Sequence, residues 1–200
     1  MKLPYPTLNY EQKLWQAGLQ YVAGIDEVGR GAFAGPVVAA AVILPTNFPT
    51  TIEVHDSKLL ISSKREALAE IIKEKALSFA IAEVSVDWIN RVGIGKASQM
   101  AFRKAVNLLP QSPQHLLIDA FYIKRLAKKK QTPIVHGDRL SLSIAAASII
   151  AKVHRDALMK GLHKEFEHLF QFLPLDFYSG IHNLYNRVVC LAVFVVVDSA

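Results

Sequence analysis

The chain has 200 residues, of which 52% are hydrophobic and 20% charged, so it can build one domain with a real core and is not a disordered polymer. Its formal net charge of +6 favours a polyanionic partner. The single cysteine, Cys190, excludes an internal disulfide framework and a zinc site built from cysteines. The amino terminus has no apolar signal segment, and the longest apolar run, Val188 to Val197, is shorter than the roughly 20 residues of a membrane-spanning helix. We therefore expect a cytoplasmic protein without membrane association.

The first third of the chain predicts a lead-in, a hairpin and a helix. Residues 8–18 indicate a short helix or an irregular segment. Residues 20–28 and 36–44 are two expected strands, and the second is almost entirely apolar, as in a strand that is covered on both faces. The short glycine-rich link between them favours an antiparallel hairpin with a bulge. A helix then begins at Ser63, with a capping box formed by Ser63 and Glu66.

The remainder alternates helices with short strands. The expected elements are a strand at 78–86, a short helical segment at 87–92, a helix at 96–109, a strand at 114–119, a strand at 132–136 and a long helix from Arg139 to about Phe166. The long helix is rich in small residues in its first half, which lets it pack close to a sheet. Together these elements predict an α/β fold, a mixed sheet with helices on its faces.

The turn after the first expected strand carries the strongest chemical signal. Asp26 and Glu27 end the apolar run, and at least one of them must face solvent or a metal ion, because successive side chains of a strand point to opposite faces. Gly29 and Gly31 permit positive φ or the close approach of a ligand, and Arg30 between them is a planar fork of donors suited to phosphate. This order suggests metal-dependent chemistry on a phosphodiester, although an isolated Asp–Glu pair is more often solvated surface.

Two further acids extend this signal. Asp119 ends its strand as Asp26 does, and if the two strands are parallel neighbours, both carboxylates emerge at the same edge of the sheet. Asp138 stands at the start of the long helix, where a helix cap and a metal ligand are equally good interpretations. Several carboxylates in one site repel each other without a cation, whereas two Mg²⁺ or Mn²⁺ ions about 3.5–4 Å apart would make the cluster a phosphoryl-transfer site.

Several longer motifs stand in the chain in a fixed order. They are Gly24 to Gly31 with Gly35-Pro36-Val37, Asp56-Ser57-Lys58, the strand that ends at Asp119, Gly137-Asp138, and Ser143 to Val153 with Arg155-Asp156. Together they closely resemble bacterial ribonuclease HII, a type 2 ribonuclease H. The match runs from about Gln20 to about Lys164.

The resemblance implies a ribonuclease H-like fold, with a mixed five-stranded sheet flanked by helices. It implies a divalent-metal-dependent endonuclease that cleaves the RNA strand of RNA–DNA hybrids and incises beside single ribonucleotides in duplex DNA, leaving a 3′-hydroxyl and a 5′-phosphate. By motif position it implies that Asp26, Glu27, Asp119 and Asp138 bind Mn²⁺ or Mg²⁺ and carry the catalysis. We expect such an enzyme to act as a monomer.

The resemblance also implies contacts with nucleic acid. The Gly-Arg-Gly turn matches the family turn that contacts the 2′-hydroxyl at the RNA–DNA junction, the group that distinguishes RNA from DNA locally. The Asp-Ser-Lys loop matches a family loop near the substrate backbone, with a solvated turn as an equal alternative. The expected contacts are Gly29, Arg30, Gly31, Ser57, Lys58 and Lys152, and Arg155 is expected near the same side of the long helix.

After about Lys164 the chain departs from the family. Members continue into a segment whose tyrosine supports recognition of a single ribonucleotide, and no segment here aligns with it, so we assign that role to neither Tyr178 nor Tyr185. We expect residues 1–168 to form the catalytic domain and 169–200 to form a divergent segment, whose end resembles a wrong reading frame or an unrelated terminus. Two alternatives stay open: another ribonuclease H-like nuclease, such as a junction-cleaving one, and an inactive nucleic-acid-binding remnant.

Overall fold

A computed structural model of the chain describes residues 5–32, 34–49, 52, 54 and 61–170. The helices within these ranges are α1 (Asn9–Gln16), α2 (Ser62–Lys75), α3 (Val86–Val92), α4 (Ile94–Leu108) and α5 (Leu142–Phe170), with two 3₁₀ turns, η1 (Lys128–Lys130) and η2 (Gly137–Arg139). The strands are β1 (Val22–Val28), β2 (Val37–Ile43), β3 (Ser78–Val84), β4 (His115–Asp119) and β5 (Gln131–Ile134). The expected divergent segment, apart from its first residues, lies outside the described residues, as do Ser57 and Lys58.

The five strands form one mixed sheet in the order β3-β2-β1-β4-β5. β1 pairs antiparallel with β2, and β2 pairs antiparallel with β3. β4 pairs parallel with both β1 and β5. The expected mixed five-stranded sheet and the antiparallel pairing of the first two strands are therefore confirmed. The connection from β2 to β3 passes through α2, so β3 joins the sheet without a hairpin turn.

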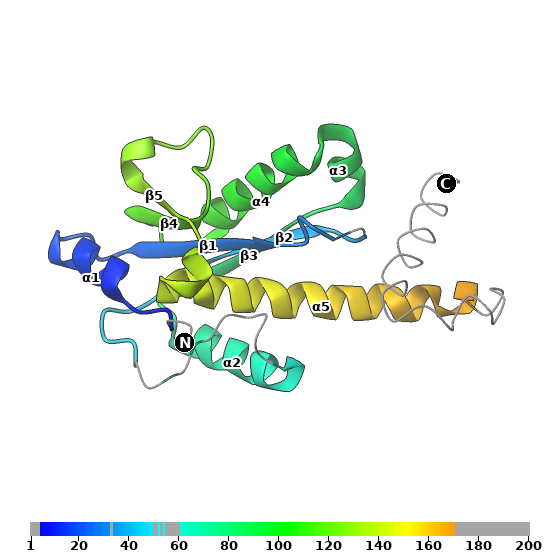
Figure 1. Ribbon diagram of the computed structural model, residues 1–200, viewed down its shortest axis with the longest axis horizontal. Helices are drawn as coiled ribbons and strands as arrows, with labels where there is room; N and C mark the ends of the chain where they lie inside the picture. The colour runs from blue at the N-terminus through cyan, green and yellow to red at the C-terminus, as the bar shows by residue number, and fades with distance from the viewer. Residues whose placement is uncertain (1–4, 33, 50–51, 53, 55–60, 171–200) are drawn as a thin grey trace.

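Helices cover both faces of the sheet (Figure 1). One hydrophobic cluster joins β2 to α5 and α2, through side chains that include Val38, Val42 and Ile150. A second cluster joins the opposite face of the sheet to α4, through side chains that include Ile43 and Phe102. Because neighbouring residues of β2 serve opposite faces, every residue of this strand is buried, which explains its almost entirely apolar sequence.

The start of α5 lies directly against β1. A Cβ atom added at Gly24 would lie 2.1 Å from the carbonyl carbon of Ser143, so only glycine permits this approach of helix and strand. The helix begins at Leu142, and the expected start at Arg139 is wrong because residues 137–139 form the separate turn η2. The Ser141 hydroxyl accepts the backbone N–H of Ile144 at 3.3 Å and so caps the helix.

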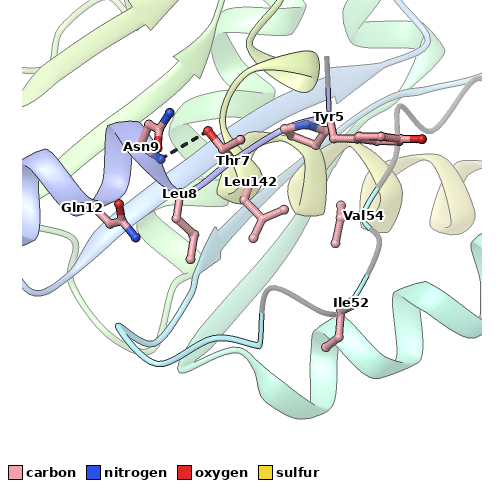
Figure 2. Close-up of a pocket in the computed structure, with 9 residues that line it drawn as sticks. Tyr5, Thr7, Leu8, Asn9, Gln12, Ile52, Val54 and Leu142 are labelled. Atoms are coloured by element: carbon pink, nitrogen blue, oxygen red, sulfur yellow. Dashed lines mark hydrogen bonds between the residues drawn. The ribbon is translucent and has the colours of Figure 1, made fainter. Parts of the chain in front are cut away.

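The N-terminal segment holds the same helix start from the other side. The backbone N–H of Thr7 donates to the carbonyl of Leu140 at 3.2 Å, and that of Leu142 donates to the carbonyl of Thr7 at 3.0 Å. Figure 2 shows Leu8 and Leu142 near Val54 around a pocket beside this contact. The segment thus joins α1 to the junction of η2 and α5.

The expected capping box at the start of α2 is wrong. The helix begins at Ser62, and Ile61 is the capping residue, with no side-chain hydrogen bond to the backbone. The Ser62 hydroxyl instead donates to Glu66 Oε1 at 3.1 Å. The helix starts one residue earlier than expected, so Ser63 lies inside its first turn and has no capping role.

Across the described ranges, no helix combines the length and the apolar character that crossing a bilayer demands.

Candidate active site

Parallel pairing of β1 with β4 brings two acids to the same edge of the sheet. Ile25 of β1 lies opposite Ile118 of β4 in the register, so Asp26 and Asp119 follow side by side at the carboxyl ends of neighbouring strands. The sequence predicted that both carboxylates share one edge of the sheet if their strands are parallel neighbours, and the strands are parallel neighbours. This edge is where α/β sheets place binding and catalytic groups.

Asp26 is the buried one of the two acids on β1, with an exposed fraction of 7%. Its Oδ1 atom accepts the backbone N–H of Glu27 at 2.7 Å, and the hydroxyl of Ser148 on α5 also bonds to its carboxylate. Burial raises the pKa of Asp26 well above its usual range, and the charges of Glu27 and Asp119 raise it further, while the two hydrogen bonds lower it. The carboxylates of Glu27 and Asp119 therefore lie close enough to Asp26 to disfavour its charge.

Asp119 is tied to the turn that carries the fourth acid. The backbone N–H of Gly137 donates to Asp119 Oδ1 at 2.7 Å. A Cβ atom at Gly137 would lie 2.6 Å from Ile144 Cδ1 and 3.3 Å from Asp119 Oδ1, so a larger residue would have to push the end of the Ile144 side chain aside. Asp138 follows within η2, is 5% exposed, and is not the cap of α5, which is Ser141. The cap interpretation of Asp138 is therefore wrong.

Glu27 and Arg30 form the outer part of the site. Arg30 Nη1 lies 3.9 Å from Glu27 Oε1, with the arginine side chain 43% exposed and the glutamate side chain 11% exposed. The guanidinium also lies over the ring of Phe121, with its central carbon 4.8 Å from the ring centroid. At 3.9 Å this ion pair is long, and the arginine side chain keeps 43% of its surface exposed, so a ligand can reach it.

The turn between β1 and β2 is held by Arg155 of α5. This arginine is 8% exposed, and its Nε and Nη2 atoms donate to the carbonyls of Pro36 and Ala34 at 3.0 and 2.5 Å. Gly29 has a φ of +103°, and a Cβ there would lie 2.7 Å from both the Pro36 carbonyl oxygen and Arg155 Nε. Arg155, expected near the nucleic-acid side, is thus buried and fixes the turn. A Cβ at Gly31 would meet nothing within 4 Å, which leaves that backbone open to a ligand.

Lys152 lies one helical turn after Ser148, on the same face of α5 as that contact to Asp26. Its amine donates to Asp156 Oδ1, while Asp156 Oδ2 accepts Arg65 Nη1 of α2 at 2.9 Å. The structure thus pairs Lys152 with Asp156, which Arg65 of α2 also binds.

The four acids offer the hard oxygen ligands that Mg²⁺ and Mn²⁺ prefer. Among the residues that the structure describes, no three acidic, histidine or cysteine side chains stand close enough together to hold a metal ion as they are oriented. The raised pKa of Asp26, caused by burial and by neighbouring carboxylates, nevertheless marks a place where a cation would relieve repulsion. The residue types fit a divalent cation, and binding requires the side chains to turn toward it.

Three side chains near this site were not singled out from the sequence. Ser148 bonds to Asp26, and its signal in the sequence is a polar residue within the apolar run from Ile144 to Ala151. Phe121 packs against the Arg30 guanidinium. The sequence around it shows only an aromatic residue two positions after Asp119, which predicts no such contact. Glu11 is fully buried and bonds to Ser141 and Ser143, and no local pattern distinguishes it from a solvated helix acid.

Comparison with known proteins gives one consistent family. The family model described as Ribonuclease HII matches residues 23–172. A protein of Koribacter versatilis named Ribonuclease HII is 52% identical over 154 residues, which are 77% of this chain and 59% of that protein. The chain thus spans about three fifths of the length of this curated relative.

Two solved structures give the fold. The ribonuclease H2 of Pyrococcus horikoshii OT3 superposes with a TM-score of 0.65 at 25% identity, over 78% of this chain and 81% of that one. Bst-RNase HIII in complex with Mn²⁺ superposes with a TM-score of 0.62 at 25% identity, over 76% of this chain and 57% of that one. The expected ribonuclease H-like fold is therefore confirmed.

Proposed function

This chain belongs to the ribonuclease HII family, and on that premise we propose that it is a divalent-metal-dependent endoribonuclease. The proposed substrates are RNA–DNA hybrids, cleaved in the RNA strand, and DNA duplexes that contain single ribonucleotides. The proposed products carry a 3′-hydroxyl and a 5′-phosphate. The observation that supports this most is the side-by-side placement of Asp26 and Asp119 at the ends of parallel strands, with Asp138 joined to them through Gly137.

We propose Asp26, Glu27, Asp119 and Asp138 as the ligands of Mn²⁺ or Mg²⁺. When bound, such ions supply an acidified water for attack on the phosphorus and a positive charge beside the leaving oxygen. The chain supplies the geometry. Ser148 and the Glu27 amide orient Asp26, and the Gly137 amide orients Asp119. The close fit of Gly137 against Ile144 fixes the turn that carries Asp138.

Recognition of ribose is proposed for the Gly29-Arg30-Gly31 turn. Arg155 and the φ of +103° at Gly29 hold this turn in one shape beside Glu27. The backbone at Gly31 has open space in front of it, where a sugar hydroxyl can approach. Arg30, half-exposed, can reach the adjacent phosphate. Ser57, Lys58 and Lys152 remain proposed backbone contacts.

Ribonuclease activity is tested with a labelled RNA–DNA hybrid, an all-DNA duplex of the same sequence and the purified chain. Incubation in Mg²⁺, in Mn²⁺ and in EDTA should give cleavage of the RNA strand with either metal, none in EDTA and none of the all-DNA duplex. Cleavage of the DNA duplex would favour the junction-cleaving alternative. Binding without cleavage by folded protein would favour the inactive remnant.

A further inference from the structure

A second, strongly basic cleft opens beside the candidate active site. It has a volume of about 790 Å³, and the residues that line it come from α4, the segment that follows β4 and the turn at Arg30. Figure 1 shows α4, which supplies much of this lining, and β4, which precedes that segment. Five cationic side chains line it, and none of the described residues that line it is acidic: the cations are Arg30, Lys96, Arg103, Lys124 and Arg125. Such a concentration of one sign of charge is suited to a polyanion and unfavourable without one.

Two large aromatic rings stand exposed in the same cleft. Phe121 is 48% exposed and Tyr122 is 45% exposed. The Arg30 guanidinium lies 4.8 Å from the centroid of Phe121, and the Lys128 amine lies 5.7 Å from that of Tyr122. Exposed rings paired with cations are the arrangement with which proteins stack unpaired bases and hold the adjoining phosphates.

Hydrogen bonds fix the wall of the cleft that follows β4. The side-chain amide of Gln99 on α4 donates to the Tyr122 carbonyl at 3.1 Å and accepts the Lys124 N–H at 2.7 Å. The buried Ile123 donates its backbone N–H to Gln131 Oε1 at 2.8 Å, so the wall is also tied to β5. Among the described residues of the lining, one buried side-chain polar atom has no hydrogen bond: the hydroxyl of Ser98, a residue that is 3% exposed.

Arg30 connects the cleft to the acids. It lies within 3.9 Å of Glu27 on one side and lines the cleft on the other. A strand whose phosphodiester lies at Asp26 and Asp119 can therefore continue past Arg30 into the cleft. In a duplex the faces of the bases are covered by their neighbours, so the exposed rings favour nucleotides that are unpaired.

We propose that this cleft binds unpaired nucleotides of the cleaved strand where they extend beyond the hybrid duplex. Bases stack on Tyr122 and Phe121, and the phosphates lie among Lys96, Lys124 and Arg125. This inference rests on the proposed function for the identity of the strand. It would give the enzyme a preference for hybrids with a single-stranded extension over blunt ones.

The test measures binding by fluorescence anisotropy in EDTA, which separates it from cleavage. The probes are a blunt RNA–DNA hybrid and hybrids with three unpaired nucleotides at either end of the RNA strand or at either end of the DNA strand. Wild-type protein should bind at least one RNA-strand extension about fivefold or more tighter than the blunt hybrid, since stacking of one base accounts for that much.

Three variants locate the effect. Tyr122→Ala should lose most of the gain, and Tyr122→Phe should keep it because the ring remains. Lys96→Ala with Lys124→Ala should also lose the gain and lower the slope of log Kd against log salt by roughly 1 to 2. The matched control, Lys73→Ala with Lys75→Ala, removes the same charge from α2 on the opposite face and should keep the gain.

Three results would overturn the inference: no gain from any extension, a gain only from extensions of the DNA strand, or equal losses in the cleft and control variants. A chain that shows the expected binding pattern but cleaves no hybrid in Mg²⁺ or Mn²⁺ would refute the proposed function and leave the cleft as a single-strand site. A chain that cleaves the blunt hybrid but gains nothing from extensions would refute the cleft alone.

Discussion

The buried carboxylate of Glu11 makes a sharp prediction about what holds the site together. Glu11 is 0% exposed, and its Oε1 atom accepts the hydroxyls of Ser141 and Ser143, each at 2.6 Å, and the Ser143 backbone N–H at 2.9 Å. These donors belong to the capping residue and the first turn of α5, which follow η2 and Asp138 closely. We predict that Glu11, from the short helix α1, is a main stabiliser of this junction.

Glu11→Ala removes the acceptor of all three bonds. A buried donor left without a partner costs roughly 1–3 kcal/mol. The two serine hydroxyls lie 3.2 Å apart and can partly satisfy each other. Each of the three unpaired donors therefore costs an amount near the lower end of that range. We therefore expect the free energy of unfolding to fall by about 3–5 kcal/mol, a large share of the roughly 5–15 kcal/mol typical of a domain.

Glu11→Gln keeps an acceptor in place and loses the charge. Bonds to an ionised acceptor are about twice as strong as neutral ones, and an anion at a helix N-terminus adds to this, so a loss of about 1–2 kcal/mol is expected. Urea unfolding followed by circular dichroism measures both variants, with Glu70→Ala, an exposed acid on α2, as the control expected to change stability by less than about 0.5 kcal/mol. If Glu11→Ala unfolds within about 1 kcal/mol of wild type, the reasoning is refuted.

The remaining predictions concern the acids, the turn and one histidine. Asp119→Asn keeps an acceptor for the Gly137 amide and should lose turnover by orders of magnitude at unchanged unfolding temperature; near-normal turnover removes Asp119 from the site. Gly29→Ala should destabilise strongly and Gly31→Ala hardly at all in thermal unfolding, and equal effects would contradict the clamp described for this turn. Burial lowers the pKa of His115, so the protein should lose stability as pH falls through about 6.5, since the unfolded chain takes up the proton more readily. In urea unfolding at pH 7.5 and 5.5, the His115→Gln variant should lose less stability between the two pH values than the wild type. An equal loss in both proteins would show that His115 does not cause the pH dependence.

The sheet was predictable from the sequence because its signals are local. An uninterrupted apolar run indicated that residues 37–43 are covered on both faces, and the structure buries all of them. The placement of Asp26 beside Asp119 needed one further fact, the parallel pairing of two strands that are far apart in sequence, which local patterns cannot supply.

The errors arose where distant contacts override local preference. The predicted long helix starts at Arg139, but residues 137–139 form the separate turn η2, whose Gly137 N–H donates to Asp119. From its position in the sequence, Arg155 is expected to be an exposed cation on the surface of a helix. It is buried instead, and it donates hydrogen bonds to the carbonyls of Ala34 and Pro36. The role of Glu11 depends on partners 130 and 132 positions away, which no spacing rule reaches.

The most direct test of the central claim uses a DNA duplex that carries a single ribonucleotide, labelled at the 5′ end of that strand. The proposed function predicts a nick on the 5′ side of the ribonucleotide in Mn²⁺ or Mg²⁺, with a 3′-hydroxyl that a DNA polymerase can extend, and no nick in EDTA or in Asp119→Asn. Cleavage of a uniform hybrid without this nick would limit the function to hybrids. Folded wild-type protein that cleaves neither substrate would contradict the account.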